Sequence, residues 1–198
     1  MSLVVITGGA RSGKSSAAQR LVASRYADAV VVVAAHTSDD HEMMRRVRRH
    51  RSERPAGFRT LEVHEGMPWT VDVPEDACLL LDCLGTLVAQ MVGAVFGMRG
   101  ETARADDVVS EETESDVENA VDALVDWLME RTADTVVVTN EVGSGIVPAY
   151  PDARLFRDVL GRANRRLAGA ADAAYLAVAG RMLDLKTMPR DAAWPEEE

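Results

Sequence analysis

The chain has 198 residues, the length of one ordinary domain that buries a core without disulfide bonds or structural metals. Its 47% hydrophobic and 27% charged residues are typical of a globular protein and exclude a chain that is disordered along most of its length. The formal net charge of −10 argues against a nucleic-acid-binding protein, and no apolar run approaches the roughly 20 residues of a membrane span.

Two further features indicate the compartment. Cys78 and Cys83 flank an apolar run and lack the spacing of zinc ligands, so we expect reduced thiols in the core of a cytosolic protein. The N-terminus has no basic region, and "LVVIT" is too short for a signal sequence. We therefore expect a cytoplasmic protein.

Short apolar runs alternate with segments of helical periodicity along the chain. Strands are predicted at 3–7, 29–35, 78–82, 135–140 and 173–180, with a further edge strand at 58–65. Helices are predicted at 13–26, 39–52, 84–98, 115–131 and 152–169. Because continuous apolar strands are buried on both faces, this alternation predicts an α/β fold of three layers around a mostly parallel central sheet.

Nothing in the composition divides the chain into several domains. It has no internal repeat and no Pro/Ser-rich linker, so we expect a single domain over 1–188. Residues 189–198, which end in "PEEE", are predicted to be a flexible acidic tail. The acidic and small polar segment 99–114 is interpreted as a mobile surface loop.

A phosphate-loop motif, G-x-x-x-x-G-K-[ST], lies between the first predicted strand and the first predicted helix. Its residues are Gly8, Gly9, Ala10, Arg11, Ser12, Gly13, Lys14 and Ser15. The two motif glycines let backbone N–H groups turn toward phosphate oxygens, while Lys14 reaches the β and γ phosphates and Ser15 holds Mg²⁺. The alternative is an ordinary glycine turn, but the full match favours the fold of a P-loop NTPase, RecA-like in type.

Other site residues follow from a rule on parallel sheets, in which ligands bind beyond the carboxyl ends of the strands. The rule brings together Thr7 onward, 34–38, 82–84 and 140–145. Asp82 ends an apolar strand, so it is a candidate Walker B acid for the metal or nucleotide. The alternative role is the N-cap of the helix that follows, and both roles are compatible.

The predicted helix at 39–52 is unusually basic for an acidic protein. The window "RRVRRHRSER" places six arginines and His50 beside only two nearby glutamates, which leaves a surplus of four positive charges. A solvated surface helix with an exposed histidine is the alternative, but such a surplus repels itself unless an anion is bound. A nucleoside triphosphate, already implied by the phosphate loop, is a simpler partner than nucleic acid.

Five blocks of sequence, in this order, carry a resemblance: "TGGARSGKS", "RRHRSERPAGFRTLE", "LLLDCLGTLV", the segment 139–172 and "YLAVAG". Together they resemble the bifunctional adenosylcobinamide kinase and adenosylcobinamide-phosphate guanylyltransferase family of cobalamin biosynthesis, over residues 3 to about 186. The resemblance implies phosphorylation of the aminopropanol hydroxyl of adenosylcobinamide with ATP or GTP. It then implies transfer of GMP from GTP to adenosylcobinamide phosphate.

In that family a histidine attacks the α-phosphate of GTP, and the resemblance assigns this role to His50. It implies nucleotide contacts by Gly8–Ser15, Ala34, Ala35, His36, Arg51, Ser52, Glu53, Arg54, Glu62 and Asp82, with Ser15 and Asp82 as Mg²⁺ ligands. The residues support the histidine role independently. A neutral imidazole is a good nucleophile toward phosphorus, and flanking arginines both favour its neutral form and neutralise departing pyrophosphate.

The resemblance also implies a homo-oligomer, a trimer, with the corrinoid bound between subunits. Two other functions remain as alternatives. One is a single-activity small-molecule P-loop kinase in which His50 is structural, and the other is a nucleotide-dependent switch protein with no small substrate. A covalent, acid-labile GMP adduct distinguishes the bifunctional enzyme from both.

Overall fold

The computed structural model describes residues 1–35, 54–64, 72–101, 104 and 107–192. The predicted basic helix at 39–52 lies outside the described residues, together with His36, His50, Arg51, Ser52 and Glu53. The same holds for 193–198 of the predicted acidic tail.

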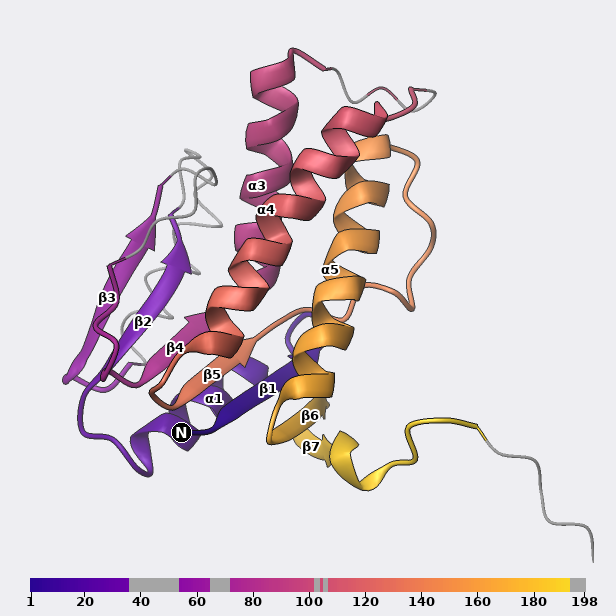
Figure 1. Ribbon diagram of the computed structural model, residues 1–198. Helices are drawn as coiled ribbons and strands as arrows, with labels where there is room; N and C mark the ends of the chain where they lie inside the picture. The colour runs from indigo at the N-terminus through magenta and orange to yellow at the C-terminus, as the bar shows by residue number, and fades with distance from the viewer. Residues whose placement is uncertain (36–53, 65–71, 102–103, 105–106, 193–198) are drawn as a thin grey trace, which may run out of the picture.

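A seven-stranded sheet in the order β3-β2-β4-β5-β1-β6-β7 forms the centre of the described structure (Figure 1). Its strands are β1 (Leu3–Gly8), β2 (Ala29–Ala34), β3 (Phe58–Val63), β4 (Leu79–Asp82), β5 (Thr135–Val138), β6 (Ala173–Val178) and β7 (Arg181–Asp184). Neighbouring strands are parallel except β6 and β7. The mostly parallel sheet and the edge position of the 58–65 strand are thus confirmed.

Helices cover both faces of the sheet, which confirms the three layers. They are α1 (Lys14–Ala23), α3 (Leu84–Arg99), α4 (Glu111–Glu130) and α5 (Pro151–Ala170), with a short 3-10 helix η1 (Leu185–Thr187). Figure 1 shows α3, α4 and α5 together on one face, with α1 on the other. Alternate residues of β4 follow this division, since Leu79 and Leu81 belong to the core under the three helices and Leu80 to the core under α1.

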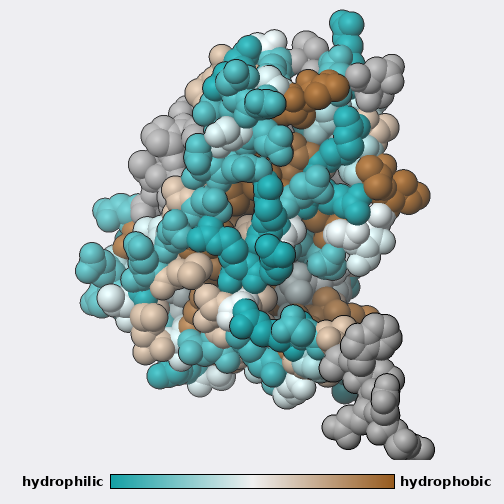
Figure 2. Space-filling view, turned by 45° about the vertical axis from the view of Figure 1, so that its right-hand side comes forward, coloured by the Kyte–Doolittle hydropathy of each residue, from teal (hydrophilic) through white to brown (hydrophobic). Residues whose placement is uncertain are grey.

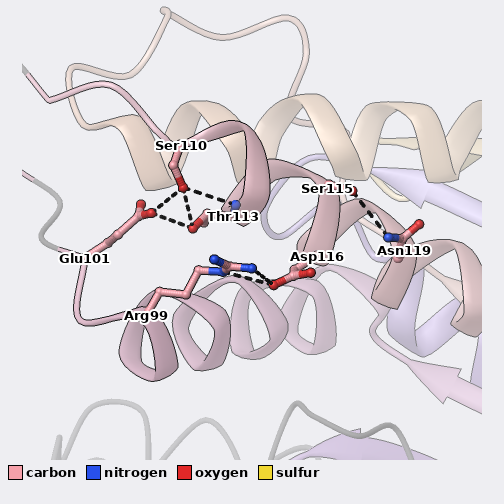
Figure 3. A network of polar contacts seen from close by, with 7 residues as sticks. All are labelled: Arg99, Glu101, Ser110, Thr113, Ser115, Asp116 and Asn119. Atoms are coloured by element: carbon pink, nitrogen blue, oxygen red, sulfur yellow. Dashed lines mark hydrogen bonds and ion pairs between the residues drawn. The ribbon is translucent and has the colours of Figure 1, made fainter.

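The predicted loop at 99–114 is shorter in the structure, because α4 begins at Glu111 instead of residue 115. The Ser110 hydroxyl caps this helix by accepting a hydrogen bond from the Thr113 N–H at 3.2 Å. The Glu101 carboxylate accepts hydrogen bonds from the hydroxyls of Ser110 and Thr113 (Figure 3). The acidic residues suggest a solvated loop in the sequence, but carboxylates in a first helical turn are stabilised by the helix dipole.

The predicted strand at 173–180 is a strand and the start of a turn. After β6 the chain reverses at Ala179 and Gly180, both with positive φ values of 48° and 77°, and β7 returns antiparallel. Two left-handed residues in succession are typical of the tight turn that joins hairpin strands. The sequence interpretation missed β7 because its residues, "RMLD", have neither a long apolar run nor β-branched side chains.

Asp134 fastens the N-terminus of the chain at the start of β5. Its carboxylate accepts hydrogen bonds at 2.8 Å from the Tyr26 hydroxyl and the Ser2 N–H, and pairs with Arg25 at 2.8 Å. The Tyr26 hydrogen bond, the Ser2 N–H and the Arg25 charge lower the pKa of Asp134 below its ordinary value. A carboxylate with a depressed pKa stabilises the fold above its unfolded pKa and loses this contribution as the pH falls.

Replacing Asp134 by asparagine should therefore lower the free energy of unfolding at pH 7 by about 1–2 kcal/mol. The difference from wild type should stay constant down to about pH 5 and shrink below about pH 4, where the unfolded chain takes up the proton before the folded protein does. Thermal melting of both proteins across this pH range measures the difference in stability. Asp191→Asn, which replaces an exposed carboxylate, is the control. A difference that does not change with pH would contradict the assignment.

Candidate functional site

The phosphate loop connects the end of β1 to the start of α1 and packs closely against β6. A Cβ atom on Gly8 would lie 2.6 Å from the carbonyl oxygen of Ala177, so this position requires glycine. Gly13 has a left-handed φ of 91° and precedes α1, whose first turn contains no acidic residue and no side-chain cap. The first N–H groups of a helix have no intrahelical partner, so the loop presents donors suited to an anion.

Lys14 and Ser15 begin α1, and their side chains contact different groups. The Lys14 side chain is buried, and its ammonium donates a hydrogen bond to the Gly9 carbonyl at 3.0 Å. This contact folds the cation back over the loop. The Ser15 hydroxyl donates to the Asp82 carboxylate at 2.8 Å, across 67 residues of sequence.

The start of α3 tests the capping role predicted for Asp82. The N-cap of α3 is Cys83, which makes no side-chain capping bond, so the capping role predicted for Asp82 is wrong. The hydroxyl and the carboxylate are hard oxygen donors, the type that Mg²⁺ prefers. The described residues contain no group of three or more His, Cys, Asp or Glu that could hold a metal ion.

The structure adds a polar group that the sequence analysis did not assign. Asn164, on α5, accepts a hydrogen bond from the Thr139 hydroxyl at 2.6 Å and donates to the Asn140 carbonyl at 2.9 Å. Glu141, which follows Asn140 in the chain, donates its backbone N–H to the Gly8 carbonyl at 3.2 Å. The segment after β5 is thus held against the phosphate loop, as the strand-end rule predicted for 140–145, but no local pattern singled out Asn164.

The two cysteines are free in the structure. Burial raises the pKa of Cys78 to about 11, and burial is also the main cause that raises the pKa of Cys83. The Cys83 thiol donates to the Asn140 side-chain oxygen at 3.4 Å. Both groups therefore stay protonated at neutral pH and are unsuited to nucleophilic attack.

The other described candidates lie around β2 and β3, and two strands, β4 and β5, separate β2 from β1. Ala35 follows β2, and its carbonyl accepts a hydrogen bond from the Gln90 side chain at 2.8 Å. The Arg54 guanidinium donates to the Thr60 hydroxyl at 2.7 Å, and Glu62 pairs with Val33 in the β2–β3 register. The structure brings Ser15 and Asp82 into contact, and it places Pro55, the residue after Arg54, in a pocket with Ser16 and Gln19 of α1.

Among the described residues, no helix is long and apolar enough to cross a membrane. Similarity to solved structures supports the fold. An ATPase from the type III secretion system of pathogenic bacteria matches with a TM-score of 0.54 and 14% identity, over 88% of this chain and 50% of that chain. The fold is therefore the P-loop NTPase type, RecA-like, as predicted.

Relatives in sequence are more similar. The profile of the family described as cobinamide kinase / cobinamide phosphate guanyltransferase matches residues 4–185. The bifunctional adenosylcobalamin biosynthesis protein CobU of Salmonella typhimurium is 37% identical over 93% of this chain and 99% of its own length. The CobU protein of Escherichia coli is 34% identical over 93% and 99%, and the CobP protein of Pseudomonas aeruginosa is 33% identical over 93% and 98%. On this likeness along nearly its whole length, the chain belongs to the cobinamide kinase / cobinamide phosphate guanyltransferase family.

Proposed function

We propose that the chain catalyses both reactions of its family. It phosphorylates adenosylcobinamide with ATP or GTP and then transfers GMP from GTP to adenosylcobinamide phosphate, which gives adenosylcobinamide-GDP. The observation that carries the kinase assignment is the 2.8 Å bond between the Ser15 hydroxyl and the Asp82 carboxylate, beside the phosphate-loop lysine. It joins the two parts of a nucleotide site that are distant in sequence.

In the kinase step, Lys14 holds the β and γ phosphates and the loop N–H groups bind the same oxygens. Ser15 and Asp82 would hold Mg²⁺, which would neutralise charge on the two phosphates. The aminopropanol hydroxyl oxygen then forms a bond to the γ phosphorus while the bond to the β–γ bridging oxygen breaks. The hydroxyl proton passes to solvent, and the nucleoside diphosphate leaves.

In the guanylyl transfer, a nitrogen of the His50 imidazole forms a bond to the α phosphorus of GTP, and pyrophosphate leaves. A phosphate oxygen of adenosylcobinamide phosphate then attacks the same phosphorus and frees the imidazole. The surplus of arginines around His50 supports this proposal, because those charges compensate a polyphosphate. The segment that carries His50 starts at Ala35, which directly follows β2 at the same edge of the sheet as the phosphate loop.

The protein is also inferred to be a homo-oligomer, a trimer by the family resemblance, in the cytoplasm. Several apolar side chains support an interface with a second copy, since they remain exposed to water: Val108, Ile146, Val147 and Tyr150. The Arg154 side chain joins their two loops by donating to the carbonyls of Ala149 and Asp107. Figure 2 shows such apolar areas on a mostly hydrophilic face, and light scattering of the protein in solution tests the assembly.

A substitution at Asp82 tests the kinase proposal. Asp82→Asn keeps an oxygen that accepts from Ser15, so the fold and much of the nucleotide affinity should remain. The kinase rate should fall by about 10²-fold, because an amide is a poor ligand for a hard cation. Steady-state rates over a Mg²⁺ titration measure this effect, with Asp116→Asn, an exposed partner of Arg99, as the control. Wild-type activity of Asp82→Asn at low Mg²⁺ would refute the metal role.

A further inference from the structure

The hairpin of β6 and β7 lies against the phosphate loop and contacts both of its ends. β6 pairs with β1 up to the register of Gly8 with Ala177, and the chain turns two residues later. The Gly180 N–H then donates a hydrogen bond to the Ser12 carbonyl at 3.0 Å. At the other end of the loop, a Cβ on Gly13 would lie 3.4 Å from the Gly180 Cα.

This hydrogen bond fixes the orientation of one peptide unit of the loop. The Ser12 carbonyl and the Gly13 N–H belong to the same planar trans peptide, so they point in opposite directions. Because Gly180 holds the carbonyl toward the hairpin, the Gly13 N–H is directed away from the hairpin, as a phosphate-binding donor requires. Ser12 is only 7% exposed, so solvent does not replace Gly180 as the partner of this peptide.

The turn that supplies the N–H depends on glycine. Gly180 has a φ of 77° after Ala179 at 48°, and side chains other than those of glycine and asparagine are strained in this region. A Cβ on Gly180 would meet nothing within 4 Å, so alanine there introduces conformational strain without a steric clash. A change in the backbone conformation of Gly180 would therefore also change the direction of its N–H group.

We propose that Gly180 is a positioning residue for nucleotide binding, which acts by orienting the Gly13 N–H toward the bound polyphosphate. The proposal rests on the phosphate-binding role of Gly8–Ser15. It extends the site to the β6–β7 hairpin, more than 160 residues further along the chain, to which the sequence analysis gave no function.

Two glycine-to-alanine variants separate positioning from stability. Gly100 ends α3 with a φ of 65°, and a Cβ there also meets nothing within 4 Å, so Gly100→Ala introduces the same kind of strain away from the loop. Both Gly180→Ala and Gly100→Ala should lower the melting temperature by similar amounts. Only Gly180→Ala should weaken the binding of inorganic tripolyphosphate, by about 10-fold in calorimetry, and Gly180→Asn should restore most of the affinity because asparagine tolerates a positive φ.

Unchanged tripolyphosphate affinity in Gly180→Ala, or equal weakening in Gly100→Ala, would overturn the proposal. If Gly180→Ala does not fold, amide hydrogen exchange of the wild-type protein decides, since the Gly180 N–H should be protected and unprotected exchange would refute it. Lys14→Ala tests the underlying site. If tripolyphosphate binds this variant as it binds wild type, the phosphate-loop assignment fails and the role of Gly180 fails with it; if only Gly180→Ala binds normally, the hairpin role alone fails.

Discussion

Replacing Lys14 by alanine should reduce the kinase kcat/KM by about 10²–10³-fold, the range seen when one preorganised electrostatic group is removed. A point charge at the β and γ phosphates is not replaced by the backbone dipoles of the loop. The Lys14 ammonium donates a hydrogen bond to the Gly9 carbonyl at 3.0 Å, which holds the charge over the phosphate loop. Nucleotide affinity by calorimetry and the initial rate of phosphorylation measure the loss.

Lys186→Ala is the matched control for this variant. The Lys186 ammonium also donates to a backbone carbonyl, that of Gly169 at 3.2 Å, but it lies on η1, outside the phosphate loop. Both variants should keep the circular dichroism spectrum of the wild type, because neither replaces a core side chain. A normal kinase rate with normal nucleotide affinity in Lys14→Ala would rule out the assigned role.

Much of the fold was predictable because a buried parallel strand has a short, continuous apolar sequence. "LVVIT", "VVVV" and "LLLD" are each recognisable without any knowledge of their neighbours. The proximity of Ser15 and Asp82 was also predictable, since both residues lie near the carboxyl ends of parallel strands. Its distance and the absence of a capping bond by Asp82 required the three-dimensional structure.

Two features of the site depend on packing between distant segments and have no local signal. Asn164 contacts Thr139 and Asn140 at the end of β5 only because α5 packs over the sheet and places this residue beside them. The Gly180 N–H reaches Ser12 only through the register of β6 with β1. A further case, the start of α4 at Glu111, was misjudged because acidic residues favour both solvated loops and first helical turns.

His50→Ala should eliminate guanylyl transfer while leaving phosphorylation of adenosylcobinamide largely intact. The physical reason is a division of labour, because Lys14, Ser15 and Asp82 position a γ phosphate without an imidazole. His50 lies outside the described residues, so its role rests on the arginine surplus around it and on the family to which the chain belongs. Alanine favours helix, so the substitution should preserve the predicted helix at 39–52.

Intact mass after incubation with GTP and Mg²⁺ measures this directly. The wild-type protein should gain the mass of one GMP, which acid removes and base does not, as expected for a phosphoramidate. His50→Ala should gain none, whereas His64→Ala, at an exposed histidine after β3, should gain the same mass as wild type. Phosphorylation assays on the same samples separate the bifunctional enzyme from the single-activity kinase, which forms no adduct at all. If His50→Ala still gains GMP, or the adduct maps to Lys14 or His36, the nucleophile is another residue and the basic segment serves only to bind the polyphosphate.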